Sequence, residues 1–118
     1  MSYDIRLNDP KTGKTIQFDE PHQLKGGTYE VGGCHEAWLN VTYNYTKHLS
    51  RALGEKGVRV LYGKTGQDSI LILKKAISKM KGDPARDYWA ATEGNARKAL
   101  QDLMDLAKMA PHGVWEGD

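Results

Sequence analysis

The stretch Ala37-Trp38-Leu39-Asn40-Val41-Thr42-Tyr43-Asn44-Tyr45 decides the fold class, because one kind of hydrophobic spacing gives way to another there. Up to Tyr43, apolar and polar residues alternate as in a strand with one buried face. Beyond it, apolar residues recur at the three- and four-residue spacing of helices. Strands first and helices afterwards predict an α+β fold, an antiparallel sheet of N-terminal hairpins with two to three helices packed on one face.

Two β-hairpins are expected to supply this sheet. Residues 3–7 and 15–18 alternate apolar with polar side chains, and the polar segment between them suits a turn. Residues 28–31 and 37–43 are rich in aromatic and β-branched residues and are separated by a glycine pair. The N-terminal third of the chain is therefore expected to be β.

The helical part begins with a short helix and an ambiguous stretch. Asn44 or Thr46 is expected to cap the short helix, and Gly54 stands where a left-handed residue ends it. Apolar residues alternate over residues 57–62, but the run is short and follows a helix closely. A strand or an irregular turn is expected there.

Two longer helices follow. Thr65 is expected to cap a helix over residues 66–81, whose apolar residues keep helical spacing until Gly82. Thr92 is expected to cap the last helix, which Pro111 ends.

The composition is typical of a globular protein. Of 118 residues, 39% are apolar and 27% charged, so residues 1–118 are expected to form a single domain. The longest apolar runs have four residues, far short of the roughly 20 of a membrane span, and the N-terminus has no apolar signal core. Because Cys34 is the only cysteine, no internal disulfide can form. A cytoplasmic location without membrane association is expected.

Charge is unevenly distributed along the chain. The net charge of +2 gives no strong nucleic-acid signal, yet residues 47–81 carry nine basic and two acidic side chains, a net +7 that leaves −5 for the remainder. Such a split can produce a positive face for phosphates or for an acidic partner. A solvated helix surface is the alternative interpretation.

Gly63-Lys64-Thr65 resembles the end of a phosphate-binding loop. The complete motif needs a glycine where this chain has Val58, so nucleotide hydrolysis is not expected. Lys64 and Thr65 nevertheless stand at a predicted helix N-terminus, where an anion is favoured. Ordinary capping by Thr65 is the alternative.

No complete catalytic or metal-binding signature is present. Neighbouring residues of a strand point to opposite faces, so Cys34-His35-Glu36 cannot all reach one metal ion. The other histidines have no partner at ligand spacing, and a cysteine next to a histidine lacks the geometry of a nucleophile with its base. We therefore expect neither a metal, a cofactor nor an enzymatic activity.

One strand has an unusual polar face. Trp38, Asn40, Thr42 and Asn44 share it, and together they offer an indole, two amides and a hydroxyl. These groups suit stacking and hydrogen bonding with a base or a sugar. The alternative is an outward-facing polar strand that ends in a helix cap.

Several pieces of the chain resemble a family of short proteins found in phage and bacterial genomes. The pieces are Gly26-Gly27-Thr28-Tyr29, residues 39–45, Tyr88-Trp89-Ala90-Ala91-Thr92, Gly94-Asn95-Ala96 and Pro111-His112-Gly113-Val114-Trp115. The resemblance brings no catalytic residue or ligand with it. It implies a context in which small proteins bind host factors or sequester small signalling molecules.

Two functions follow as expectations. The first is a non-enzymatic phage-type accessory protein that binds a small anionic, nucleotide-like ligand, such as a host immune signal, through the polar strand face with help from Lys64 and Thr65. The second is an inhibitor or adaptor that binds a host defence protein through the basic face of residues 47–81. The sequence does not indicate an oligomeric state.

Overall fold

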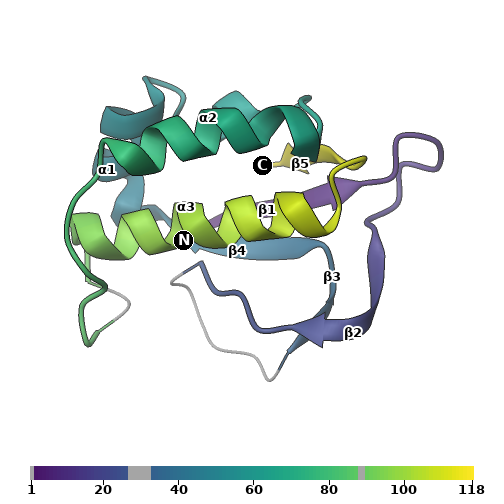
Figure 1. Cartoon of the computed structure of the whole chain (residues 1–118), viewed down its shortest axis with the longest axis horizontal. Helices are drawn as coiled ribbons and strands as arrows, with labels where there is room; N and C mark the ends of the chain where they lie inside the picture. Colours follow the sequence, from purple (N-terminus) through teal and green to yellow (C-terminus); the bar gives the residue numbers. More distant parts are fainter. Residues whose placement is uncertain (1, 27–32, 88–89) are drawn as a thin grey trace.

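A computed structural model describes residues 2–26, 33–87 and 90–118. Its elements are β1 (Ser2–Asn8), β2 (Gln17–His22), β3 (Cys34–Glu36), β4 (Trp38–Thr42), the 3-10 helix η1 (Tyr43–Tyr45), α1 (Thr46–Leu53), the 3-10 helix η2 (Gly57–Leu61), α2 (Gly66–Ser78), α3 (Glu93–Met109) and β5 (Val114–Gly117) (Figure 1). The expected α+β fold is confirmed. None of the described helices is long and apolar enough to cross a membrane.

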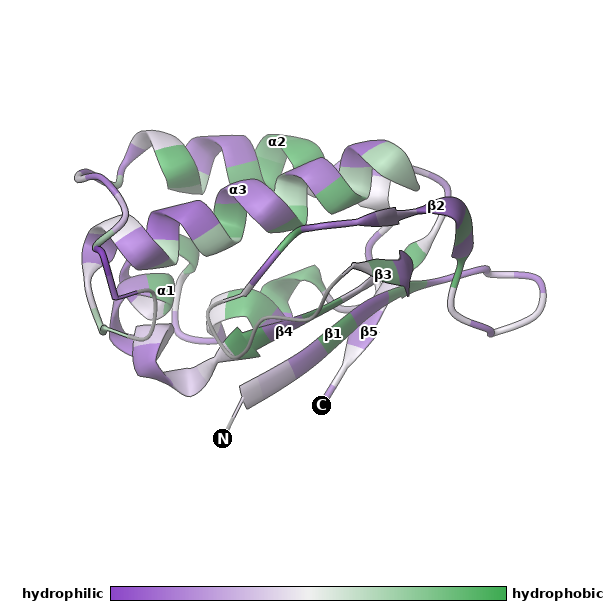
Figure 2. Ribbon diagram, turned by 90° about the horizontal axis from the view of Figure 1, so that it is seen from below, coloured by the Kyte–Doolittle hydropathy of each residue, from purple (hydrophilic) through white to green (hydrophobic). Residues whose placement is uncertain are grey.

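The main sheet has three antiparallel strands in the order β4-β1-β5. The central strand pairs Tyr3 with Val41 on one side and Leu7 with Trp115 on the other. A second, two-stranded sheet is formed by β2 and β3. Figure 2 shows α2 and α3 together over one face of the main sheet.

The hydrophobic core lies between that face and the helices. Alternate residues of the strands are buried, which is the period of two that the sequence predicted. Fully buried side chains are contributed by Ile5, Leu7, Val41 and Trp115 from the strands, by Leu49 and Leu73 from α1 and α2, and by Leu100, Leu103 and Leu106 from α3. The core therefore combines strands from both ends of the chain.

The first predicted hairpin is wrong in its strand pairing. Its turn does form: the Asp9 amide donates to the Lys14 carbonyl over 2.8 Å, and the Ile16 amide donates to the Leu7 carbonyl over 3.0 Å. Beyond Ile16, however, β2 pairs with β3 instead. The reason is that β4 and β5 together occupy both edges of β1.

The remaining strand predictions had mixed outcomes. The expected strand over residues 37–43 is confirmed as β4, whereas its expected partner, residues 28–31, lies outside the described residues. A strand over residues 57–62 is wrong, because this stretch forms η2. Its buried apolar residues, Val58 and Leu61, are three positions apart, which is the period of a 3-10 helix.

The caps of the two long helices are confirmed. The Thr65 hydroxyl accepts from the Asp68 amide, and the Thr92 hydroxyl accepts from the Asn95 amide, both over 3.1 Å. The second helix is shorter than predicted, since α2 ends at Ser78.

The predicted cap of the short helix is wrong. One turn of 3-10 helix, η1, is inserted before α1, and the Thr42 hydroxyl caps it by accepting from the Asn44 amide over 3.2 Å. Thr46 is consequently the first residue of α1 rather than its cap. Gly54, with a φ of 102°, ends α1 as predicted.

Candidate functional site

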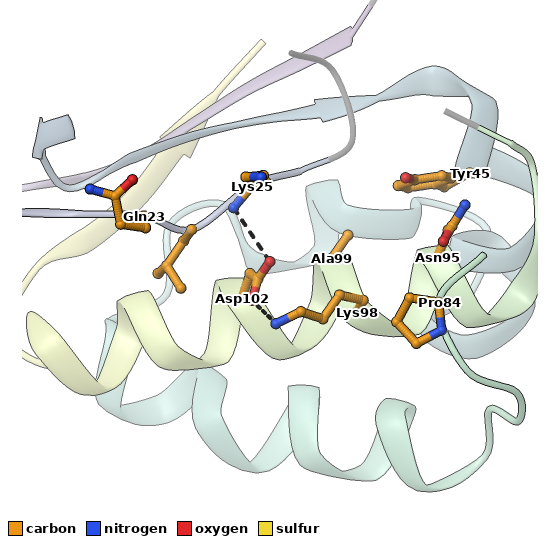
Figure 3. Close-up of a pocket in the computed structure, with 9 residues that line it drawn as sticks. Gln23, Lys25, Tyr45, Pro84, Asn95, Lys98, Ala99 and Asp102 are labelled. Atoms are coloured by element: carbon orange, nitrogen blue, oxygen red, sulfur yellow. Dashed lines mark hydrogen bonds and ion pairs between the residues drawn. The ribbon is translucent and has the colours of Figure 1, made fainter. Parts of the chain in front are cut away.

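A cavity of about 270 Å³ lies between the segment that follows β2 and the side of α3 (Figure 3). It is lined by Gln23, Leu24 and Lys25 from that segment, by Tyr45 of η1, by Pro84, and by Asn95, Lys98, Ala99 and Asp102 of α3. Four parts of the chain thus meet at one site.

The floor of the cavity is one face of α3. Lys98, Ala99 and Asp102 follow Asn95 by three, four and seven positions, the spacing of residues that share a helix face. Such a stripe is usually apolar. Here it buries an amide and a carboxylate instead, and the small side chain of Ala99 between them leaves room for the cavity.

Asp102 is the charged group at the base of the site, and its side chain is almost fully buried. Its Oδ1 accepts from the Lys98 ammonium over 2.8 Å, and its Oδ2 accepts from the Lys25 amide over 3.4 Å. Burial raises the pKa of this carboxyl above its ordinary 3.8, and Lys98 opposes the shift by stabilising the charged form. Because the Lys98 side chain is half exposed, its ammonium connects the buried carboxylate to the cavity mouth.

Asn95 fixes the opposite end of the floor. Its side-chain oxygen accepts from the Ala85 amide over 2.8 Å, and its side-chain nitrogen donates to the carbonyls of Asp87 and Ala90, each over 2.9 Å. All three bonds go to the connector that precedes α3. Asn95 therefore holds the connector, including Pro84, against the cavity.

The facing wall is held at both of its ends. At one end the Leu24 amide donates to Nδ1 of buried His22 over 3.2 Å, so Nε2 carries the proton and donates to the Glu36 carbonyl over 2.8 Å. At the other end the Thr42 amide donates to the Gly26 carbonyl over 3.1 Å. These bonds place residues 23–25 over α3.

The polar strand face of the sequence prediction is only partly assembled. Trp38 and Asn40 are half-buried and alternate with the buried residues of β4, as expected. Thr42, however, is 2% exposed, because it turns inward to cap η1, while Asn44 lies exposed in that 3-10 helix. The hollow that Trp38 lines together with Asn40 is about 20 Å³, room for about one water molecule, and a separate hollow of about 320 Å³ is lined by Trp38 with Gly33, Cys34 and Glu36 but not by Asn40.

Lys64 and Thr65 lie at the opposite edge of the main sheet from Trp38. The Trp115 amide donates to the Lys64 carbonyl over 2.9 Å, and Thr65 forms a bridge with Val114. Since β1 separates β5 from β4, the fold does not bring these residues together with the Trp38 face.

The hollow lined by Trp38 and Asn40 and the cavity next to α3 differ in the charged residues that line them. The Trp38 indole donates to the Asp4 carboxylate, and Arg6 of the same strand as Asp4 pairs with Trp38 on one side and with exposed Glu116 of β5 on the other. Lys25 lines both this hollow and the cavity, whereas Lys98 and Asp102 line the cavity alone.

No group of three or more histidine, cysteine or acidic side chains within residues 2–26, 33–87 and 90–118 is arranged to hold a metal ion. None of the family models, curated proteins or solved structures compared with the chain matches it.

The cavity residues were missed by sequence reasoning, although a signal was present. The alanines and leucines of the last helix give no reason to bury Asn95 and Asp102, because polar residues of an amphipathic helix are expected to face solvent. Both flank Ala99 at helical spacing. Two polar residues on the same helix face as a small core residue, as Asn95 and Asp102 are with Ala99, indicate a cavity rather than an exposed surface.

Proposed function

We propose that this chain is a non-enzymatic binding protein that holds a small anionic, nucleotide-like ligand in the cavity between residues 23–25 and α3. The observation that carries the proposal is the convergence at one cavity of two lysine residues, a buried carboxylate and an aromatic side chain. Pockets with apolar walls and a few fixed polar groups are typical of small-molecule sites.

The lining suits the two parts of such a ligand. Leu24 and Ala99 contribute apolar surface from opposite walls, between which a planar ring can insert. Lys25 is exposed at the mouth, where an ammonium group can attract a phosphate. The volume of about 270 Å³ is just below the range of about 300 to 1,000 Å³ for drug-sized ligands. It fits one base, with the remainder of the ligand at the mouth.

Sequestration of a host signal is the biological role that this binding would serve, in keeping with the resemblance to small phage proteins. Sequestration needs affinity and no chemical step. A buried, charge-paired carboxylate with hydrogen bonds already made is suited to holding a ligand.

Isothermal titration calorimetry with the four common ribonucleoside monophosphates tests the proposal. Lys25→Met should weaken binding about fivefold to tenfold, the effect of about 1 kcal/mol. Ala99→Leu, which fills the cavity, should abolish it. Lys11→Met, in the exposed turn after β1, is the matched control and should bind as the wild type does.

Trp38→Ala separates this site from the one that the sequence suggested, and it should leave nucleotide affinity unchanged. The proposal is wrong if no nucleotide binds. The cavity is the wrong site if Trp38→Ala removes binding while Ala99→Leu keeps it.

A second candidate function is binding of an acidic protein through the basic face of residues 47–81. All nine basic side chains of this stretch are exposed. On α2, Leu71 is 60% exposed, and Lys74 and Lys75 follow it by one helical turn. An apolar side chain surrounded by ammonium groups suits an acidic partner with an apolar contact.

The two candidates predict opposite patterns. If the basic face carries the biological activity, Lys74→Glu combined with Lys75→Glu should remove that activity and spare nucleotide affinity. Lys25→Met should then spare activity. If Lys25→Met removes the activity and the double lysine variant keeps it, binding in the cavity is the favoured function.

A further inference from the structure

We propose that the Lys98–Asp102 pair makes the cavity selective for guanine among the nucleobases. This inference rests on the proposed nucleotide-binding function and names the part of the ligand that the site recognises. It follows from the order of donors and acceptors that the pair presents to the cavity.

Asp102 presents two acceptors. A carboxylate has about four lone-pair positions, and each oxygen of Asp102 accepts one hydrogen bond from the described residues, Oδ1 from the Lys98 ammonium and Oδ2 from the Lys25 amide. Each oxygen therefore retains capacity for one further donor. A ligand with two adjacent N–H groups can use both oxygens at once.

Lys98 adds a donor beside these acceptors. Its ammonium group has three N–H bonds, of which one is directed to Oδ1 of Asp102 over 2.8 Å. In order, Lys98 Nζ, Asp102 Oδ1 and Asp102 Oδ2 present donor, acceptor and acceptor. That is the order with which cytosine pairs to guanine.

Guanine is the base that complements this order. Its pairing edge presents the O6 acceptor, the N1–H donor and the N2 amino donor, whereas adenine presents the N6 amino donor followed by the N1 acceptor. Adenine would set its N1 lone pair against the carboxylate and its amino group against the ammonium. Since Asp102 is 3% exposed, water cannot relieve that mismatch.

The place of the pair on α3 leaves room for the rest of the nucleotide. Asp102 lies seven residues from Asn95, roughly 10 Å along the helix axis. The small side chain of Ala99, between them, leaves space in the cavity. Figure 3 shows Lys98 and Asp102 at one end of the cavity and Tyr45 and Asn95 at the other. A guanine at the Asp102 end leaves its ribose and phosphate toward the mouth, beside exposed Lys25.

Calorimetry with guanosine, inosine and adenosine monophosphates tests this order directly on the wild-type chain. Inosine lacks only the N2 amino group, so it should bind about tenfold more weakly than guanosine, the effect of one lost charge-assisted hydrogen bond. Adenosine should bind at least about a hundredfold more weakly.

Asp102→Asn replaces one acceptor with a donor and should remove the preference for guanosine over adenosine. Asp105→Asn, an exposed carboxamide one turn away on the same helix, should keep it. If the wild type binds all three nucleotides with equal affinity and Ala99→Leu binds none of them, guanine selectivity is overturned. The proposed nucleotide-binding function then still holds. Absence of binding by all three would overturn both. Because the nucleotide series uses the wild type, the test does not depend on the folding of the variant.

Discussion

The indole nitrogen of Trp115 donates a hydrogen bond to the hydroxyl of Ser69 over 2.7 Å, and both side chains are completely buried. This bond joins β5 to α2 across the core. The Ser69 hydroxyl in turn donates to the Gly66 carbonyl over 2.7 Å. It therefore donates within the helix and accepts from the Trp115 N–H. The C-terminal strand is thereby connected to the first turn of α2.

Ser69→Ala should destabilise the protein by about 1 to 3 kcal/mol, because it leaves the Trp115 N–H buried without a partner. Ser78→Ala is the matched control. The Ser78 hydroxyl also donates to a carbonyl three residues earlier, that of Lys75, but it is exposed, so the loss should stay within about 0.5 kcal/mol. Urea unfolding curves measure both. Equal losses would mean that the indole bond contributes nothing.

The pH dependence of stability should reveal the buried carboxyl of Asp102. Burial raises its pKa in the folded protein, so the folded state binds this proton more tightly than the unfolded state does. Its contribution to stability is therefore complete below 3.8 and is lost as the pH rises through the higher folded value. Relative to Asp102→Asn, the wild type should lose unfolding free energy as the pH rises above 3.8.

The control for this experiment is Asp105→Asn, whose carboxylate is exposed on the same helix. The Asp105 charge is the smallest contribution to the raised pKa of Asp102, and burial is the largest, so Asp105→Asn should keep most of this pH dependence. A difference between wild type and Asp102→Asn that does not vary with pH would contradict the shifted pKa.

Local signals in the sequence predicted local structure well. Thr65 and Thr92 were identified as caps because the hydroxyl and the amide that it accepts from are only three residues apart. Pairing between distant segments was not predictable in this way. The strand β5 was missed because four residues after a proline and a glycine carry little pattern, and they form a strand only by pairing with residues 5–8 of β1.

The candidate site was harder to predict for the same reason. Trp38 and Asn40 stand out by composition, whereas Asp102 is ordinary in an amphipathic helix, where an acidic residue is expected to face solvent. Asp102 is buried because residues 23–25 fold over α3, a contact between segments 77 residues apart. Burial of that kind depends on the tertiary fold and not on local spacing.

The hydroxyl of Tyr62 should titrate late. Burial, followed by the nearby negative charge of Asp118, raises its pKa to about 12, and the buried oxygen has no hydrogen-bond partner among the described residues. Its neutral form is therefore favoured by folding, and the stability that this gives is lost as the pH rises from about 10 to 12. Ultraviolet titration of tyrosinate should lose its latest transition in Tyr62→Phe.

At neutral pH, Tyr62→Phe should not destabilise the protein, because removing an unpaired buried hydroxyl sacrifices no bond. Above about pH 10 the variant should become the more stable of the two. A loss above 1 kcal/mol at neutral pH would indicate a partner for this hydroxyl.

Asn95→Asp should test whether the connector is held by the side-chain amide. The substitution keeps an oxygen to accept from the Ala85 amide but removes both donors to the carbonyls of Asp87 and Ala90, and it sets a carboxylate against those oxygens. Losing these two part-buried hydrogen bonds should cost about 1 to 3 kcal/mol in urea unfolding. Gln101→Glu, a similar amide-to-acid change on the more exposed side of α3, should cost less than about 0.5 kcal/mol.

Because Pro84 lines the cavity next to the bonded connector, Asn95→Asp should also weaken nucleotide binding, provided that the variant remains folded. Full stability of Asn95→Asp would show that the connector is held by other contacts, and unchanged affinity would remove this end of the cavity from the binding site.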